Sequence, residues 1–273
     1  MASVSSLIAA CDDYLLKEAK TRRERKTARV ERRLTRALGK AFMAQGRYFV
    51  QEFRALEYLF PIRESVTPAD WLPLFIAASQ RSLALFSGPL DQAIRDALAI
   101  GAAVRIADVG FDLLFNLQHP RAIAYLDQVG AQLVRGIDET TRTYLQTTIS
   151  NAVAEGATPK QVEERIIERY RHFAVGRPQR HIDSRAHMIA VTEIGNAYEQ
   201  GADIVTRDLQ GAGIQLEKRW AGPRDDRTSA ACLGNMEEGW IDYDTPFSSG
   251  DHRPLHHPGC RHSLAVRRKR DAA

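Results

Sequence analysis

The end of the chain carries Cys232 and Cys260 and, close to Cys260, the histidines His256, His257 and His262, whose side chains offer the chemistry of a metal site. Thiolate and imidazole groups are the usual ligands of zinc, and a structural zinc site needs four of them. His257 and Cys260 flank a Pro258-Gly259 pair, which predicts a turn short enough for both side chains to reach one ion. The predicted zinc ligands are Cys232, His257, Cys260 and His262.

A purely structural explanation of these residues stays open beside the metal site. The segment has no Cys-x-x-Cys pair, so its spacing is not that of the common zinc motifs. A buried cysteine can act as a small hydrophobic residue, and histidines can hydrogen-bond to backbone groups. The third cysteine of the chain is Cys11, and so sparse and odd a number predicts a reducing compartment rather than a disulfide framework.

A basic stretch near the N-terminus offers binding chemistry of another kind. Ten basic residues lie between Lys17 and Arg36, against the three acidic residues Glu18, Glu24 and Glu31. On a helix they are expected to cover most of the circumference, leave little apolar surface and contact phosphates without reading base sequence. The residues predicted to bind nucleic acid are Lys20, Arg22, Arg23, Arg25, Lys26, Arg29, Arg32, Arg33 and Arg36. A solvated helix surface and an acidic protein partner are the alternatives.

The hydrophobic spacing predicts helices over most of residues 6–154, with breaks at Pro61, at residues 87–89 and at residues 116–120. A helix starting at Thr67-Pro68 follows the first break. Thr158 and Gln161 have the spacing of a capping box and predict another helix, which ends near Tyr170. A longer helix is predicted from Arg177-Pro178 to about Gln210.

Side-chain alternation then predicts short strands at Ile214–Trp220, Trp240–Tyr243 and Ser263–Val266. The predicted fold class is therefore mainly α, with a long helical N-terminal part followed by a small loop-rich α+β C-terminal domain. We place the boundary between an α-helical region at 1–155, which carries the basic helix, and a C-terminal domain at 156–273. Trp220 is expected in the core of that domain.

The composition is that of a globular protein with a real core, since 44% of the residues are hydrophobic and 26% are charged. The sequence has no apolar run of about 18 residues, which excludes a membrane-spanning helix and predicts no membrane partner. The N-terminus has neither a basic region nor a long apolar stretch, so we do not expect it to be a secretion signal.

Three motifs follow one another between about Ser184 and Val266. They are the helical segment Arg185–Glu193, with Ala197 and Gly201 after it, the segment Lys218–Thr228, and the closing segment Pro254–His262. In this order they resemble the helix signature, the strand with its Asp-x-Arg segment, and the closing His-Pro-x-Cys-Arg segment of the phage Mu F-like (MuF) family. The matching positions are Arg185, Thr192, Glu193, Trp220, Asp225, Arg227, His257, Pro258, Cys260 and Arg261.

This resemblance implies a minor capsid protein of a tailed bacteriophage, acting in head morphogenesis rather than as an enzyme. The implied partners are the portal protein, a scaffold or major capsid protein, and phage DNA during packaging or ejection. The implied location is the host cytoplasm during assembly, and then the virion, at the portal vertex or inside the head. A basic helix suits a protein that meets packed DNA.

The chain departs from the family pattern at three positions. Ser229 stands where the family has the first cysteine of a Cys-x-x-Cys pair, and His262 replaces the last cysteine of the closing segment. These two changes alter any metal site. Val191 stands where the family has an arginine, which weakens the charge cluster of the Thr-Glu helix.

The alternative function is a nuclease or nucleotide-modifying enzyme that uses the His-, Asp- and Glu-rich C-terminal domain. Its possible acid–base pairs are His187 with Glu193 and His256 with Asp226. The sequence has no Gly-rich phosphate loop and no recognisable Ser-His-Asp order, so we expect no catalytic residues.

Overall fold

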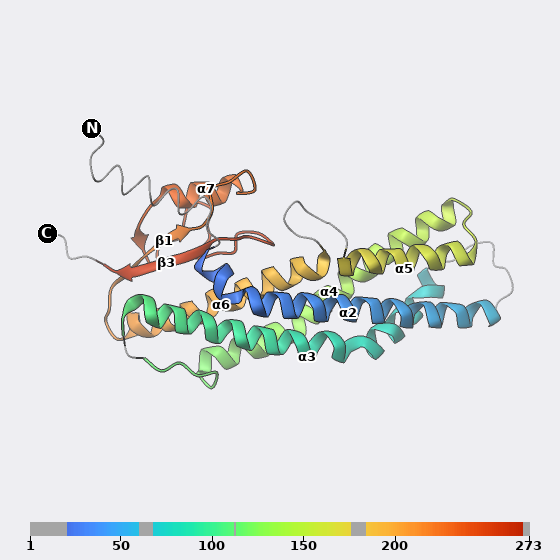
Figure 1. The fold of residues 1–273 in the computed structure, drawn as a ribbon, viewed down its shortest axis with the longest axis horizontal. Helices are drawn as coiled ribbons and strands as arrows, with labels where there is room; N and C mark the ends of the chain where they lie inside the picture. The colour runs from blue at the N-terminus through green and yellow to red at the C-terminus, as the bar shows by residue number, and fades with distance from the viewer. Residues whose placement is uncertain (1–20, 60–67, 112, 176–183, 270–273) are drawn as a thin grey trace. The chain divides into compact units, whose positions relative to one another are not determined.

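A computed structural model describes residues 21–59, 68–111, 113–175 and 184–269 (Figure 1). Cys11 and Lys20 lie outside the described residues, as does the expected helix start at Arg177-Pro178. The described helices are α2 (Arg22–Leu59), α3 (Pro68–Val109), α4 (Pro120–Ala154), α5 (Pro159–Val175), α6 (Arg185–Gly211) and α7 (Ala230–Glu237). The strands are β1 (Leu216–Ala221), β2 (Ile241–Asp242) and β3 (Ser263–Arg268). The prediction of a mainly α chain with a small α+β C-terminal part is confirmed.

Contacts divide the described chain into two compact units. Unit 1 contains the described parts of Met1–Glu31, Ala93–Ala124 and Met188–Ala273, and unit 2 contains those of Arg32–Gln92 and Tyr125–His187. This division differs from the single boundary expected near residue 155. Helices α2, α3, α4 and α6 each contribute residues to both units, so no one cut along the chain separates them.

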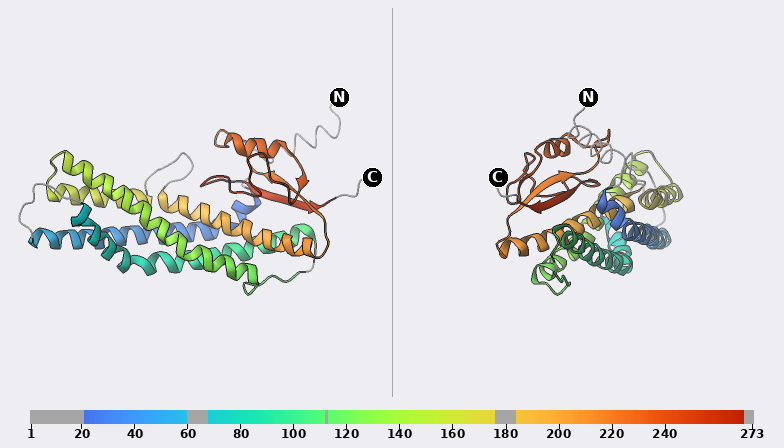
Figure 2. Two further views of the ribbon diagram at one scale, coloured as in Figure 1. Left: turned by 180° about the vertical axis from the view of Figure 1, so that it is seen from behind. Right: turned by 60° about the vertical axis from the view of Figure 1, so that its left-hand side comes forward.

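Unit 2 is a bundle of helical segments from α2, α3, α4 and α5, which run side by side in Figures 1 and 2. Aromatic side chains fill its centre: the ring of Phe42 lies 5.0 Å from that of Phe86 and 5.4 Å from that of Phe173. The Gln45 amide donates to Ser79 Oγ and to Asp138 Oδ1, both at 3.1 Å. These bonds satisfy the amide N–H groups of Gln45, a side chain that is fully buried in the bundle.

Unit 1 is built around the three-stranded antiparallel sheet, whose strand order is β2-β1-β3. The register pairs Trp220 with Leu264, and Leu216, Lys218 and Trp220 alternate with more exposed residues along β1. Helix α7 packs against β1 (Figure 1). Val205 of α6 and the α7 side chains join the same buried cluster, so this helix and sheet share one core.

Several helix limits agree with the predictions. Helix α3 begins at Pro68 and α5 at Pro159, where the backbone N–H of Thr158 donates to Gln161 Oε1 at 2.8 Å and completes the expected capping box. The predicted break at residues 87–89 is wrong, because α3 continues through Pro89. A proline removes one hydrogen bond from a helix interior. The burial of Phe86 and Leu90 on either side of Pro89 offsets this loss.

Helices α3 and α6 approach each other very closely in unit 1 at two glycines. A Cβ atom on Gly101 would lie 1.9 Å from the carbonyl oxygen of Tyr198, and one on Gly201 would lie 2.0 Å from that of Leu98. Both obstacles are backbone atoms, which cannot move aside without moving a helix. A glycine is therefore required at each position for this packing.

We expect Gly201→Ala to lower the free energy of unfolding by about 1–3 kcal/mol or more, because the added methyl group overpacks the contact. The matched control is Gly136→Ala in α4, where an added Cβ would meet no atom within 4 Å. That change should stabilise the helix by roughly 0.5–1 kcal/mol. Thermal unfolding followed by circular dichroism measures both, and an unchanged Tm for Gly201→Ala would contradict the close packing.

Candidate metal centre

The first sulfur of the site comes from the start of helix α7. Ser229 is the N-cap of this helix, with extended backbone angles, and its Oγ accepts a hydrogen bond from the backbone N–H of Cys232 at 3.3 Å. A serine is among the best N-cap residues, because its oxygen satisfies a free N–H of the first turn. Ser229 therefore orients the turn that carries Cys232. No helix was expected at residues 230–237, although Ser229 could have indicated a helix start.

The second sulfur and an imidazole come from the loop before β3. The backbone N–H of Cys260 donates to the His257 carbonyl at 3.1 Å, and Gly259 has a φ of 72°. Proline followed by a glycine of positive φ is the pattern of a type II turn. The turn expected at Pro258-Gly259 is confirmed. The backbone N–H of Gly259 also donates to Thr192 Oγ1 of α6 at 3.0 Å, which attaches the turn to that helix.

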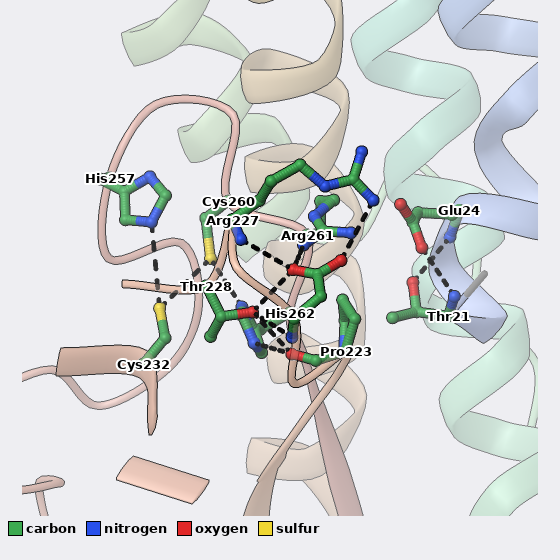
Figure 3. Close-up of polar contacts among 11 residues, drawn as sticks. Thr21, Glu24, Pro223, Arg227, Thr228, Cys232, His257, Cys260, Arg261 and His262 are labelled. Atoms are coloured by element: carbon green, nitrogen blue, oxygen red, sulfur yellow. Dashed lines mark hydrogen bonds and ion pairs between the residues drawn. The ribbon is translucent and has the colours of Figure 1, made fainter. Parts of the chain in front are cut away.

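Three of the four predicted ligands come together (Figure 3). Cys232 Sγ lies 3.8 Å from Cys260 Sγ and 4.0 Å from His257 Nε2, and the three ligand atoms all lie within 4.8 Å of one another. In a tetrahedral zinc complex, bonds of about 2.3 Å to sulfur and 2.0–2.1 Å to nitrogen put two sulfurs about 3.8 Å apart and a sulfur and a nitrogen about 3.6 Å apart. The cluster is therefore nearly the right size for a metal ion.

His262, the fourth predicted ligand, lies beside Cys260 and outside this group of three. Its Nδ1 is 3.4 Å from Cys260 Sγ and its Nε2 is 3.2 Å from the Pro223 carbonyl oxygen. A Cβ on Gly222 would come within 2.4 Å of the ring, so the imidazole is tightly packed. His262 thus contacts Cys260 through Nδ1 and the Pro223 carbonyl through Nε2, and its tautomer decides which nitrogen donates.

The two thiols are electrostatically unequal. The hydrogen bond from Cys232 lowers the pKa of Cys260, and His262 lowers it further. The same thiol pair and burial raise the pKa of Cys232. Among the described residues, the buried indole Nε1 of Trp220 has no hydrogen-bond partner, and Trp220 acts to lower the pKa of Cys232. A thiolate at Cys232, as in a metal complex, would give this indole N–H an anionic neighbour, so the surroundings fit a bound cation.

A polar network around Asp225 holds the neighbouring loop. Asp225 pairs with Arg261 and accepts a bond from the backbone N–H of Arg227 at 3.1 Å. The Arg261 guanidinium holds the pKa of the Asp225 carboxyl well below its usual range. Thr228 Oγ1 donates to the Pro223 carbonyl at 2.9 Å, and this bond joins the two ends of the loop formed by residues 223–228. Since Arg261 lies between Cys260 and His262 in sequence, the network orients the closing motif.

Three other motif residues, Trp220, Glu193 and Arg185, have different surroundings. Trp220 is buried with its ring edge-on to Phe247, at 5.1 Å, so its expected core position is confirmed. Burial raises the pKa of Glu193 to about 7, while a hydrogen bond from Asn196 opposes the shift. Arg185 belongs to unit 2, where it donates to Thr141 Oγ1 at 2.6 Å and to the Ile137 carbonyl at 2.9 Å.

The residues considered for acid–base catalysis have other relationships. His256 Nδ1 lies 2.6 Å from Asp251 Oδ2, and that carboxylate also accepts a bond from Ser249 Oγ at 2.7 Å. The Asp251 carboxylate is therefore a direct partner of His256. His187 and Glu193 are six residues apart on α6, which puts them about 120° apart around a helix.

The basic helix α2 has two distinct faces, which corrects the expectation that cations surround it. At 100° per residue, its exposed basic side chains between residues 22 and 36 fall within an arc of about 120°. These are Arg22, Arg25, Lys26, Arg29, Arg32, Arg33 and Arg36. Lys40, Arg47 and Arg54 are also exposed and continue the same arc, which contains no acidic residue between residues 22 and 54. We call these ten residues the basic stripe.

The opposite face of α2 is buried and contains one arginine. Arg23, Thr27, Val30, Leu34 and Leu38 are all buried and recur at steps of three and four residues. Arg23 is 1% exposed and its guanidinium donates to two backbone carbonyls of unit 1, so its assignment to nucleic-acid binding is wrong. In the sequence, Arg23 recurs with the apolar residues of this face at steps of three and four residues, and this spacing distinguishes it from the other basic residues.

In comparisons with known proteins, no family model, no curated protein and no solved structure matches the chain. Within the described residues, no helix is both long enough and apolar enough to cross a membrane.

Proposed function

We propose that this chain is a minor head protein of a tailed bacteriophage, of the MuF-like kind, which acts in head assembly at the portal vertex and contacts phage DNA. The observation that supports this proposal best is that parts of all three family-like motifs meet in unit 1. Thr192 accepts a hydrogen bond from Gly259, and Asp225 pairs with Arg261. Motifs separated by dozens of residues therefore share one small framework, as expected if they form one functional module.

We propose further that the cluster of Cys232, His257 and Cys260 binds zinc. Two thiolates and an imidazole are a ligand set that zinc prefers over the harder cations magnesium and calcium. Three protein ligands leave one tetrahedral position, for which His262 is a candidate because its Nδ1 is 3.4 Å from Cys260 Sγ. The ion would join α7 to the loop before β3 and stabilise a region with little regular secondary structure.

The purified protein should contain a single zinc ion per chain, measured by elemental mass spectrometry. Chelation should lower the Tm by about 5–15 °C, because a structural zinc site contributes several kcal/mol to folding. Cys260→Ser should lose the ion, since it removes a thiolate at the centre of the cluster. The control is His256→Ala, which alters the imidazole next to His257 and should keep the ion. Zinc-free protein whose Tm is unchanged by added zinc would contradict the proposal.

The basic stripe supports the proposed DNA contact. It follows residues 22–54 of one helix, with side chains on a single exposed arc. Some of its members have protein partners, as Arg22 has in Asp108 and Arg54 has in Glu163. Cations aligned along one face can contact successive phosphates of a duplex, and each contact releases counterions.

Replacing Arg29, Arg32 and Arg36 together by glutamine should weaken binding to a duplex of random sequence about 10–100-fold near 0.1 M salt. The slope of log Kobs against log salt concentration should become shallower by up to about 3. Fluorescence anisotropy over a salt series measures both. The control removes the same charge from helix α5, by Lys160→Gln with Arg165→Gln and Arg171→Gln, and should change binding much less. Equal losses in both variants would indicate a general charge effect without a binding face.

The head-assembly role is tested by quantifying the tagged protein in purified procapsids and mature heads from infected cells by mass spectrometry. We expect a few copies per procapsid and co-purification of the portal protein. Absence from both particles would overturn the head-assembly proposal and favour an assay for metal-dependent cleavage of DNA and RNA, with His256→Ala as a test of the catalytic alternative.

A further inference from the structure

Among the basic residues that the structure describes between residues 21 and 36, Arg23 is the one that is buried. Its Nη1 donates to the His262 carbonyl oxygen and its Nη2 to the Cys260 carbonyl oxygen, both at 2.6 Å. One guanidinium thus holds two backbone groups of the segment that carries the Cys260 thiol. All three residues belong to unit 1.

A glycine in helix α6 leaves space for the Arg23 side chain. A Cβ on Gly195 of α6 would lie 3.3 Å from Arg23 Nη1 and 2.9 Å from Leu255 Cδ1, so a larger residue would crowd both. Glu199, one turn further along α6, is also buried, and its carboxyl group interacts electrostatically with Arg23. Burial raises the pKa of Glu199 to about 7, and the charge of Arg23 acts most strongly to lower it. The Arg23 cation is thus buried with a compensating group.

We propose that Arg23 is a positioning residue of the metal centre, which fixes the backbone on both sides of Arg261 so that the Cys260 thiolate faces Cys232 and His257. The inference rests on the proposed zinc site. Thr192 holds the preceding residue, since it accepts the N–H of Gly259 at 3.0 Å. The loop is therefore held at Gly259, Cys260 and His262 by two side chains from α6 and α2.

The chemistry requires an arginine at this position. A guanidinium is planar and presents parallel N–H groups that can bond to two acceptors in a fixed geometry, whereas a lysine ammonium acts as a point charge. Removing the fork would leave two carbonyls of a buried loop without their partner, at a cost of about 1–3 kcal/mol each. Residues that orient metal ligands in this way typically change metal affinity about 10–100-fold when they are replaced.

Zinc binding and the start of α2 are consequently coupled. If the ion orders the loop, it also orders the two carbonyls that Arg23 binds, and this coupling is reciprocal. Zinc should therefore slow amide hydrogen exchange in the first turns of α2, at residues 22–31, as well as in the ligand loop. This readout uses the wild-type chain and needs no substitution.

The affinity for zinc is measured by competition with a chromophoric chelator in wild-type protein, Arg23→Gln, Arg23→Lys and Arg29→Gln. Arg29 is exposed on the same helix, so Arg29→Gln removes the same charge without touching the loop. We expect Arg23→Gln to weaken zinc binding about 10–100-fold, Arg23→Lys to retain part of the affinity, and Arg29→Gln to match the wild type. Cobalt(II) added in place of zinc gives absorption bands that report how the thiolates are arranged, and these bands should change in Arg23→Gln alone.

The outcomes separate this inference from the zinc proposal. If wild-type protein binds neither zinc nor cobalt, both are overturned. If it binds zinc, and Arg23→Gln binds with the same affinity and the same cobalt spectrum, the zinc site stands and the role of Arg23 is overturned. If Arg23→Gln fails to fold, the role of Arg23 is tested by the zinc affinity of Arg23→Lys and by the hydrogen-exchange measurement on the wild-type protein. Protection of residues 22–31 that does not respond to zinc would then overturn the inference.

Discussion

Two buried sulfur atoms, 3.8 Å apart, join the pieces of unit 1 that have the least regular structure. One belongs to an eight-residue helix and the other to a loop that leads into a six-residue strand. A sheet with a two-residue edge strand has few hydrogen bonds of its own, so it depends on side-chain links to keep its loops in place. The thiol pair, the turn at Pro258-Gly259 and the Asp225 network supply such links within a few residues of one another.

Helix α6 provides the surface to which these loops attach. Thr192, Gly195 and Glu199 recur at steps of three and four residues, so they share one side of the helix. The first binds the turn, the second leaves space for Arg23 and Leu255, and the third lies buried near the Arg23 charge. Further along, Gly201 allows the backbone of α3 to approach. One helix thus serves both the packing of unit 1 and the geometry of the cysteine cluster.

Basic residues of helix α2 differ in their roles because they lie on different faces of the helix. The basic stripe lies on the exposed arc, where water solvates each charge and a polyanion could replace that water. Arg23 lies on the opposite face, where direct bonds to carbonyl oxygens and the nearby Glu199 carboxyl group offset the cost of burying a cation. The proposed DNA surface and the proposed support of the metal site therefore begin on opposite sides of one helix.

Much of this architecture could be predicted from residue types and local spacing. The capping box at Thr158 and Gln161, the turn at Pro258-Gly259 and the strands near Trp220 and Leu264 follow from local rules, and the residue types alone singled out Cys232, His257 and Cys260 as candidate ligands. Tertiary packing decided the rest. Packing of the residues on either side of Pro89 allows α3 to continue through that proline. A contact with Pro223 holds His262 outside the group of three, and Asp251 is the partner of His256. Tertiary packing also separated Arg23 from its fellow cations, because the partners of a side chain depend on segments that arrive from elsewhere in the chain, whereas turns and caps depend on residues a few positions away.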